Sequence, residues 1–349
     1  MAFALRRQTS YPPLPRQTAR VTMKDVAAIA GVTSMTVSRA LHRPEMVADA
    51  TRERVLEVVA ETGFIPNLAA GTLSATRSRI VTAVVATLAE PGAAEIVSGL
   101  SDTLSEAGYQ LLLNQSRFDP KTEEALLRAA LGWTPAAVVM SGMTHTRATR
   151  LMLQRAGVPV IEMNEIDSRP IDMAVGLSNF EGGRESAVFM AKRGSRRIGF
   201  LHGSLRHNER VRRRRDGFLK GLVDAGLEAE PGLTLEIEAN PHGGARGLAT
   251  MLERYADLDG IVAATEREAV GVLQECLRRG LDVPGRIAIM GWGDSELSAE
   301  MVPALTTVHT RRYEIGYRTG QVILNRLEGR KSKQNVIDLG FEIVARQST

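Results

Sequence analysis

The sequence predicts a small all-α module followed by a two-lobed α/β core with parallel sheets. A compact helical stretch runs from Thr22 to about Phe64. From Arg79 onward, short apolar runs alternate with amphipathic helical patterns, as in βαβ units whose sheets are buried on both faces. This second part is about 270 residues long, which exceeds one average domain and therefore predicts two lobes.

The composition excludes several classes of protein. The 349 residues contain one cysteine, Cys276, so neither a disulfide framework within one chain nor a CxxC zinc or redox site is expected. The six histidines show no zinc-ligand spacing, and we expect no metal and no cofactor. No apolar run approaches the roughly 18 residues of a membrane span, and the first 20 residues lack the apolar stretch of a signal peptide. We therefore expect no membrane partner and a place in the reducing cytoplasm.

The net charge of +4 is unevenly distributed. Residues 1–79 contain 11 basic and 6 acidic side chains, a net charge of +5, and the remainder carries −1. A basic N-terminal module on a nearly neutral body suggests a polyanion as the partner of that module alone.

Thr22 and Asp25 predict the start of the first helix, because they have the spacing of a capping box. The helix MKDVAAIA then ends at Gly31, and Thr33 can cap a second helix, SMTVSRAL (34–41). Two short helices joined by such a tight turn form the helix-turn-helix pattern.

A third helix is expected from about Asp49, closing the small core with Val55, Leu56 and Val59. An ordinary three-helix bundle would have the same spacing. The basic charge of the module and its full set of three helices favour double-stranded DNA as the partner.

In a helix-turn-helix unit the N-terminal residues of the second helix lie at base edges in the major groove. Ser34, Met35 and Arg39 are the exposed candidates there, and Arg39 can donate to guanine through two parallel hydrogen bonds. Residues suited to phosphate contacts, which set the register on DNA, are Thr22, Thr33, Thr36 and Ser38. His42 fits either a DNA contact or the end of the helix.

A short segment, Pro66 to Thr76, follows the module. Pro66 suits a helix start, but a helix of seven or eight residues that contains Gly71 is too short to persist alone. It would need a partner helix and DNA to hold it, which suggests a switch.

The core contains seven apolar runs that predict strands. Amphipathic stretches such as 93–108 and 148–157 lie between them. The predicted strands are 80–88, 109–115, 136–142, 159–163, 197–203, 260–265 and 286–292.

These residues together resemble a known family. VTMKDVAAIAGVTSMTVSRAL, followed by TRERVLEVVAETGFIPNLAAGTL, is similar to the headpiece and hinge of the lactose/galactose-repressor (LacI/GalR) family, and the likeness covers all but the first 20 residues. The resemblance implies a homodimeric transcription regulator with a helix-turn-helix headpiece, a hinge helix and a core like a periplasmic sugar-binding protein. An effector bound between the lobes would change the affinity for operator DNA.

The resemblance also implies roles for single residues. Arg39 matches the family's base-reading arginine, and Ser34 and Met35 occupy its variable specificity positions. Asn67 matches a phosphate contact of the hinge, and Ala70 belongs to the same set of expected DNA contacts. Leu73 matches the leucine that, with its dimer mate, wedges into a central base step from the minor groove. Gly71 stands where polar residues are usual, so we expect a weakened hinge helix.

The expected domain boundaries follow from this resemblance and, for the first 20 residues, from a composition rich in Pro, Arg, Gln and Thr without a periodic pattern. They are a disordered arm (1–20), the DNA-binding headpiece (21–66), the hinge helix and linker (67–78) and the effector-binding and dimerisation core (79–349). Within the core we expect one lobe from about 79–177 and 310–330, and a second from about 178–309 and 331–349. The chain ends without a leucine heptad, so a dimer is expected rather than a tail-linked tetramer.

Ligands in parallel α/β lobes sit beyond the carboxyl ends of the strands. The stretch from Arg210 to Gly217 matches the family's Arg-x-x-Gly element, which makes Arg214 the implied effector-binding arginine, whereas its neighbouring arginines fit a solvated helix face. The family usually carries Asn-Asp where this chain has Thr265-Glu266. It commonly has Tyr/Phe-Asp-Asp where this chain has Trp292-Gly293-Asp294, so one hydroxyl-binding carboxylate is lost.

Loss of an acid near the ligand favours an anionic effector, whose carboxylate Arg214 can bind through paired hydrogen bonds. Several motifs, among them SGMTHT (141–146) and GWGDSE (291–296), resemble the gluconate-operon repressor subgroup, which implies a sugar acid such as gluconate or a keto-gluconate. The expected effector-binding residues are His145, Glu162, Asn164, Arg214, Thr265 and Asp294. His145 fits a plain loop histidine equally well.

Other functions fit the sequence less well. An enzyme is not expected, because the chain lacks a dinucleotide fingerprint, a GxxxxGK[ST] loop and a GxSxG elbow. A periplasmic-type sugar-binding protein would need an export signal and would not carry the module at 22–76. Within regulators, a neutral sugar, a phosphosugar or a purine-type co-repressor stays open, and so do the direction of the switch, the operator bases and the target genes.

Overall fold

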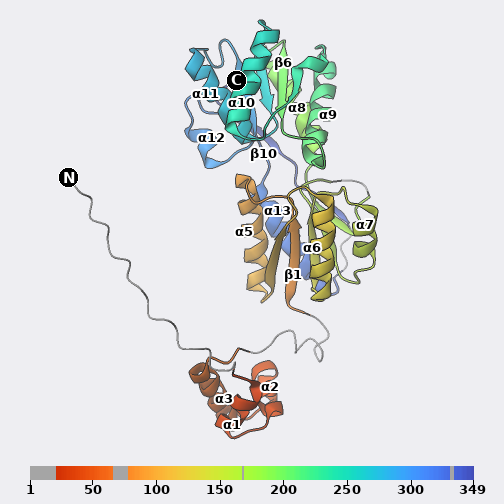
Figure 1. Ribbon diagram of the computed structural model, residues 1–349, viewed down its shortest axis with the longest axis vertical. Coiled ribbons are helices and arrows are strands. Elements are labelled where there is room, and N and C mark those ends of the chain that lie inside the picture. Colours follow the sequence, from red (N-terminus) through yellow and green to blue (C-terminus); the bar gives the residue numbers. More distant parts are fainter. Residues whose placement is uncertain (1–20, 66–77, 167–168, 331–333) are drawn as a thin grey trace, which may run out of the picture. The chain divides into compact units, whose positions relative to one another are not determined.

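A computed structural model describes residues 21–65, 78–166, 169–330 and 334–349 (Figure 1). The chain divides into two units, Met1–Thr76 and Arg77–Thr349, and each has its own hydrophobic core. The expected arm at 1–20 and nearly all of the expected hinge at 67–78 lie outside the described residues. Within the described part of the chain, no helix is both long and apolar enough to cross a membrane.

The first unit is the predicted helical module. Thr22 caps the first helix through a capping box with Asp25, and Gly31 ends it at φ 64°, a left-handed conformation that suits glycine. The Thr33 hydroxyl caps the second helix by accepting from the Thr36 N–H. The helices are α1 (Met23–Ala30), α2 (Ser34–His42), η1 (Pro44–Met46) and α3 (Asp49–Thr62).

The core of the module differs from the prediction at one position. Val55 is fully buried and Val59 packs against the core, as expected, but Leu56 is 41% exposed. Val58 takes its place inside, because residues three positions apart share a helix face whereas neighbours point about 100° apart. The other core members come from α1, α2 and Phe64.

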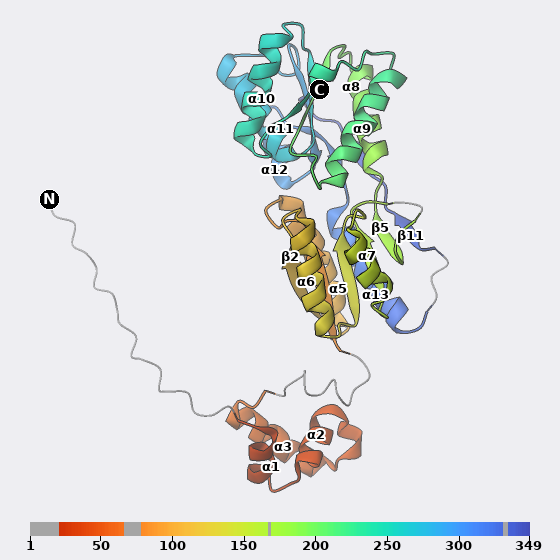
Figure 2. The ribbon, with the colours of Figure 1, turned by 45° about the vertical axis from the view of Figure 1, so that its right-hand side comes forward.

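The second unit consists of two lobes, each built around one sheet (Figure 2). The first lobe has a six-stranded parallel sheet with the strand order β11-β5-β4-β3-β1-β2. Helices α5 and α13 cover one face, and α6 and α7 cover the other. The strands are β1 (Ile80–Val85), β2 (Gln110–Gln115), β3 (Ala137–Ser141), β4 (Val160–Met163), β5 (Met173–Gly176) and β11 (Val336–Asp338); the helices are α5 (Pro91–Glu106), α6 (Pro120–Gly132), α7 (Arg147–Gln154) and α13 (Arg312–Leu327).

The second lobe repeats this arrangement with the strand order β12-β10-β9-β8-β6-β7. The edge strand β12 runs antiparallel to β10, so this sheet departs from the all-parallel prediction. Helices α8 and α9 cover one face, and α10 and α11 cover the other. The strands are β6 (Ile198–His202), β7 (Thr234–Glu236), β8 (Gly260–Ala263), β9 (Ala288–Gly293), β10 (Thr306–His309) and β12 (Glu342–Val344); the helices are α8 (Asn179–Lys192), α9 (Glu209–Asp224), η2 (Pro231–Leu233), α10 (Pro241–Arg254), α11 (Glu266–Arg279) and α12 (Glu296–Glu300).

The chain crosses three times between the lobes, after β5, after β10 and after β11. The prediction that residues 331–349 belong wholly to the second lobe is wrong, because β11 pairs with β5 in the first sheet. The Leu339 N–H then bonds to the Gly176 carbonyl, and the chain enters the second lobe only at β12. A three-residue strand at a sheet edge carries too little pattern to be predicted from the sequence.

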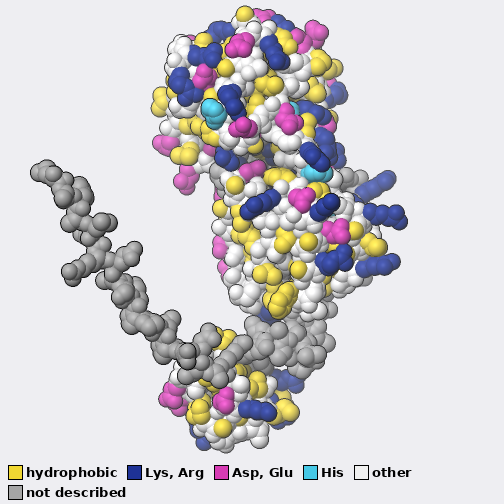
Figure 3. Space-filling model, in the orientation of Figure 1, with side chains coloured by type: hydrophobic (Ala, Val, Ile, Leu, Met, Phe, Trp, Pro, Cys, Tyr) yellow, Lys and Arg dark blue, Asp and Glu magenta, His cyan; other side chains and the backbone are white. Residues whose placement is uncertain are grey.

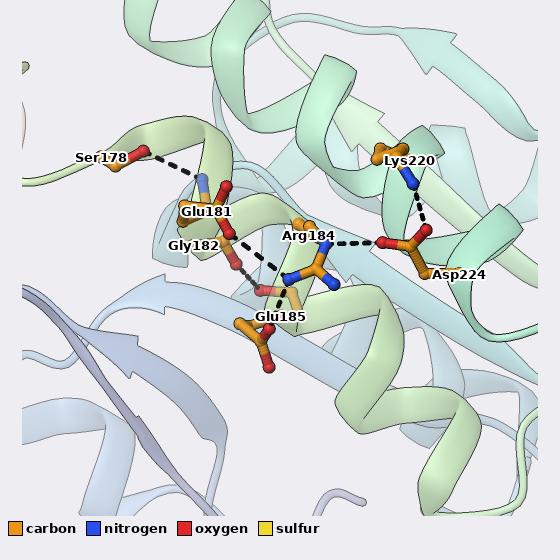
Figure 4. A network of polar contacts seen from close by, with 8 residues as sticks. Ser178, Glu181, Gly182, Arg184, Glu185, Lys220 and Asp224 are labelled. Carbon is orange, nitrogen blue, oxygen red and sulfur yellow. Dashed lines mark hydrogen bonds and ion pairs between the residues drawn. The ribbon is translucent and has the colours of Figure 1, made fainter. Parts of the chain in front are cut away.

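Helices α8 and α9 pack backbone to backbone, and this fixes the position of α9. A Cβ added at Gly217 would lie 1.9 Å from the Phe180 carbonyl oxygen, so no side chain fits there. At the surface, Arg184 of α8 pairs with Asp224 of α9 at 2.6 Å, and Asp224 also pairs with Lys220 (Figure 4). These surface pairs contribute little energy individually, so close packing dominates.

Candidate functional site

The second helix of the helical unit presents the residues predicted to read DNA. Met35 is 63% exposed, Arg39 is exposed and Ser34 is half-buried, so the outer face of α2 is open to a partner. Met35 and Arg39 are four residues apart and therefore lie on the same side of the helix. The placement agrees with a role at base edges, which stays a prediction.

Two of the four residues whose hydroxyls are predicted to bind phosphate, Thr22 and Thr33, already act as helix caps. Thr22 Oγ1 donates to the Asp25 carboxylate at 2.7 Å, and the Thr33 and Thr36 hydroxyls lie 3.0 Å apart. Ser38 is half-buried on the same helix. His42 is the last residue of α2, and its side chain is not described. Asn67, Ala70 and Leu73 lie outside the described residues.

A cavity of about 70 Å³ lies between the two lobes of the second unit. Its wall includes residues at the carboxyl ends of β1, β3, β4 and β9, which is where ligands bind in parallel α/β folds. The remaining wall comes from α5, α9, the crossover segments and α13. The lining residues are Val85, Thr87, Glu90, Gly92, Ala93, Ile96, Val97, Ser141, Met163, Asn164, Leu177, Arg210, Arg214, Trp292, Thr310, Arg312 and Ile315.

The lining of this cavity has an excess of positive charge. Arg210, Arg214 and Arg312 face a single acid, Glu90. Arg312 also pairs with Glu95 at 3.3 Å, outside the lining. Hydroxyl and amide groups complete the polar wall, and apolar side chains from both lobes supply the rest. Such a wall suits a small anion that also carries hydroxyl groups.

Arg214 is held rigidly at the centre of the wall. Its Nε donates to Asn179 Oδ1 at 2.8 Å, and Nη1 donates to the Ala264 carbonyl at 2.7 Å. The guanidinium lies 4.0 Å from the ring centre of Trp292, a cation–π contact. Burial and the nearby charge of Arg210 lower the pKa of Arg214 to about 9, so the group is charged at neutral pH at a cost that an anionic ligand would offset.

The edge of the Trp292 ring lies against the start of α8. A Cβ added at Gly182 would be 2.4 Å from Trp292 Cη2, so the ring fits only because residue 182 has no side chain. Trp292 is 5% exposed. The ring thus shields Arg214 from water on one side and forms part of the cavity wall.

Asn164 links the first lobe to this arrangement. It ends β4 with φ at 72°, a left-handed conformation that is uncommon outside glycine and concentrates at functional sites. Its carbonyl accepts from Asn179 Nδ2 at 2.8 Å, and Asn179 in turn accepts from Arg214. A chain of hydrogen bonds therefore runs from the first lobe to the arginine of the second.

Of the six predicted effector-binding residues, the structure places Asn164 and Arg214 in the cavity wall and the other four elsewhere. Thr265 is the N-cap of α11, and its N–H donates to the Glu268 carboxylate at 2.9 Å. Asp294 pairs with Arg346 at 2.7 Å and with His309 at 3.0 Å, so its carboxylate is already engaged.

His145 and Glu162 belong to a buried cluster inside the first lobe. His145 Nδ1 lies 2.9 Å from Glu123, and Nε2 lies 3.3 Å from Glu162 Oε1. The His145 side chain is 1% exposed, and its two carboxylate neighbours outweigh burial to raise its pKa to about 9. Glu162 Oε2 accepts from the Ile171 N–H at 2.6 Å. His145 lines a second cavity, separate from the one beside Arg214.

Sequence reasoning missed several members of the wall. Arg210 precedes Arg214 by about one helical turn, so the two side chains lie on the same side of α9. This spacing within the arginine run could have predicted that Arg210 also lines the cavity. Glu90, Trp292 and Arg312 come from distant parts of the chain, and only the folded arrangement brings them together. Among the described residues, no group of histidine, cysteine and acidic side chains could hold a metal ion.

The sequence matches known proteins along most of its length. A model described as bacterial regulatory proteins, lacI family, matches residues 22–67, and one described as a periplasmic binding protein-like domain matches residues 187–349. The chain is 33% identical over 324 residues to the HTH-type transcriptional regulator GntR of Escherichia coli K12, covering 93% of this chain and 97% of the relative. It is 32% identical over 337 residues to a regulator of the same name from Pseudomonas aeruginosa, covering 96% and 97%.

A solved structure shows a similar architecture. The crystal structure of a LacI-family transcriptional regulator from Silicibacter pomeroyi gives a TM-score of 0.88 at 33% identity, covering 94% of this chain and 99% of that chain. The likeness therefore extends over both units of the fold.

Proposed function

Since the chain belongs to the LacI family of bacterial regulatory proteins, and is a DNA-binding transcriptional repressor of that family, we propose that a small sugar-acid effector controls its operator affinity. The effector is gluconate or a close relative, bound in the cavity between the lobes. Relatives named GntR, at 32–33% identity over most of the chain, support this choice.

The observation that carries the proposal is the Arg214 guanidinium, which lies in the cavity wall without a carboxylate partner among its hydrogen bonds. Asn179 and the Ala264 carbonyl use two of its five N–H donors. A carboxylate in the cavity would satisfy remaining donors through charge-assisted bonds. The nearby Arg210 and Arg312 add to the attraction for an anion.

The polyol part of a sugar acid also has partners in the same wall. Ser141, Asn164 and Thr310 offer hydroxyl and amide groups, and Glu90 offers a carboxylate that accepts from hydroxyls. The Trp292 ring supplies an apolar surface. A neutral sugar would leave the wall with more arginines than acids, which is why we favour the acid.

The switch acts through the two lobes and the paired headpieces. We propose a homodimer in which two copies of α2 read a pseudo-palindromic operator, with Arg39 at base edges and Leu73 wedged into the central step. The effector touches both lobes, so its binding changes their relative arrangement, separates the hinge segments and lowers operator affinity. Because the operator is chromosomal DNA, we place the protein in the cytoplasm.

Calorimetric titration of the full-length protein tests the effector. Gluconate, 2-keto-gluconate and 6-phosphogluconate are compared with glucose, using wild type, Arg214→Ala and the control Arg128→Ala, an arginine whose side chain is 67% exposed on α6. We expect a sugar acid to bind wild type and the control equally. Arg214→Ala should bind it about 100-fold more weakly, the loss expected for a buried charge-assisted pair. Binding of glucose alone would contradict the proposal.

A further inference from the structure

A second cavity, of about 470 Å³, lies between the first lobe and the other side of α9. Its first-lobe wall contains Arg150 of α7 and Arg169, together with the loop that follows β3. Its second-lobe wall contains Arg212 and Arg213 of α9. In the orientation of Figure 3, basic side chains project from the edge of the first lobe where α7 lies in Figure 1.

The spacing along α9 separates the two cavities. Glu209, Arg212, Arg213 and Asp216 follow the i, i+3, i+4, i+7 pattern of one helix face. Arg210 and Arg214 are offset from that face by about a third of a turn and line the cavity between the lobes. One helix therefore contributes arginines to two distinct sites.

The second cavity has more positive than negative charge available to a ligand. Its two acids have other partners in its surroundings: Glu209 accepts from the Met143 N–H at 3.0 Å, and Asp216 pairs with Arg215 at 2.6 Å. The four arginines of the wall outnumber these two acids, so the lining carries a surplus of positive charge.

A paired histidine and a main-chain contact of Arg150 also belong to this cavity. His145 lies there, with its own positive charge balanced by Glu123 and Glu162 inside the lobe. The Arg150 guanidinium donates to the Met143 carbonyl at 3.4 Å, so a main-chain group holds it near the cavity. Arg150 is therefore positioned before any ligand arrives.

We propose that this second cavity is a binding site for a small polyvalent anion that carries phosphate, distinct from the effector site beside Arg214. Planar guanidinium groups match phosphate oxygens through paired hydrogen bonds, and four of them exceed the charge of a single carboxylate. A cavity of about 470 Å³ has the size of small-molecule sites. The concave shape favours a small phosphate compound over the backbone of a nucleic acid.

The site also bridges the lobes. Arg150 and Arg169 come from the first lobe, and Arg212 and Arg213 from the second. The Met143–Glu209 hydrogen bond already joins the two lobes at this edge. An anion bound to all four arginines would strengthen that connection and favour the lobe arrangement seen in the structure.

The test uses the full-length protein with pyrophosphate as the probe and calorimetry as the readout. Arg150→Gln/Arg212→Gln removes two charges from the cavity. Arg128→Gln/Arg278→Gln removes two from exposed positions on α6 and α11 and is the matched control. We expect the cavity variant to bind pyrophosphate about tenfold more weakly or worse, and the control to bind like wild type. Arg214→Ala should bind pyrophosphate like wild type, which separates this site from the effector site.

Four results would overturn the inference. One is an absence of pyrophosphate binding to wild type at millimolar concentration. A second is an equal loss in both double variants, which would indicate general charge attraction. The third is loss of pyrophosphate binding in Arg214→Ala alone, which would place the anion beside Trp292. Competition by a short DNA duplex of unrelated sequence for the cavity arginines would also contradict a small-molecule site.

Discussion

Substitution of Gly182 by alanine tests how the cavity wall is built. The added Cβ would lie 2.4 Å from Trp292 Cη2, whereas ordinary contact begins at 3.4 Å, so the indole must move by about 1 Å. Moving it disturbs the contact with Arg214, whose guanidinium lies 4.0 Å from the ring centre. The substitution therefore acts on the effector site through the ring alone.

A second helical glycine, Gly132, serves as a control that separates the cost of the clash from the gain of replacing a helical glycine with alanine. Overpacking costs about 1–3 kcal/mol, whereas replacing a helical glycine with alanine gains up to about 1 kcal/mol. Gly132, at the end of α6, has no atom within 4 Å of an added Cβ, so Gly132→Ala shows only the gain. We expect Gly182→Ala to be less stable than Gly132→Ala by about 1–3 kcal/mol, or about 2–4 °C in Tm per kcal/mol for a unit of this size.

Tryptophan fluorescence reports the ring directly. The chain has two tryptophans, and Trp133 is 60% exposed, so a Trp133→Phe background leaves Trp292 as the single reporter. In that background Gly182→Ala should shift the emission of Trp292 toward that of a wetter indole. It should also weaken gluconate binding by about tenfold, which corresponds to about 1.4 kcal/mol of lost cation–π and wall contacts.

The double variant Gly182→Ala/Trp292→Phe provides the decisive comparison. Phenylalanine is shorter and lacks Cη2, so the clash disappears and Tm should recover relative to Gly182→Ala alone. The reasoning is refuted if Gly182→Ala and Gly132→Ala change Tm equally, or if Trp292→Phe restores nothing.

Three further predictions concern the other parts of the protein. Arg39→Ala should weaken operator binding by about 1–3 kcal/mol and relax the preference at one base, as measured by anisotropy on operator variants; equal loss on every sequence would mean a phosphate contact instead. Leu73→Ala should cripple operator binding while gluconate binding in the calorimeter is spared, and unchanged operator affinity would argue against the wedge. His145 has a raised pKa, so its protonated form stabilises the folded protein by up to about 3 kcal/mol. This contribution is fully present below about pH 6.5 and is lost as the pH rises through about 9. His145→Gln should remove that pH dependence in unfolding curves between pH 6.5 and 9.5, and an unchanged curve would mean that Glu123 and Glu162 do not hold the charge.

Local signals in the sequence were sufficient for the helical unit. Thr22, Gly31 and Thr33 set the ends of α1 and α2 through their own side chains and backbone, so their pattern alone located the helices. Leu56 was assigned to the core although it is 41% exposed, because the apolar pair Val55–Leu56 gives no sign of which member faces inward.

Strand prediction succeeded where the strand is buried on both faces. All seven predicted runs form strands. Six of them lie inside a sheet, where strands between two helix layers are continuously apolar, and the seventh, β2, is an edge strand with an apolar centre. The five remaining strands, β5, β7, β10, β11 and β12, are only three or four residues long. All five lie at or next to a sheet edge, where tertiary pairing rather than composition decides the structure.

The cavity wall was only partly predictable. Arg214 and Asn164 could be assigned because family resemblance placed them. Asp294 was expected in the wall for the same reason, but Arg346 from the end of the chain pairs with its carboxylate. No sequence pattern joins residues 294 and 346, because the third crossover between the lobes brings them together.

The central claim is that an anion beside Arg214 controls operator binding. Fluorescence anisotropy of full-length protein on a duplex selected from a random-sequence pool, titrated with gluconate, tests it directly. The account predicts that gluconate weakens operator binding by wild type by about tenfold or more, the usual scale of allosteric coupling. Arg214→Ala should bind the same duplex as tightly as wild type does without gluconate, and gluconate should not release it. A variant that still responds like wild type, or a wild type released by glucose but by no sugar acid, would contradict the account.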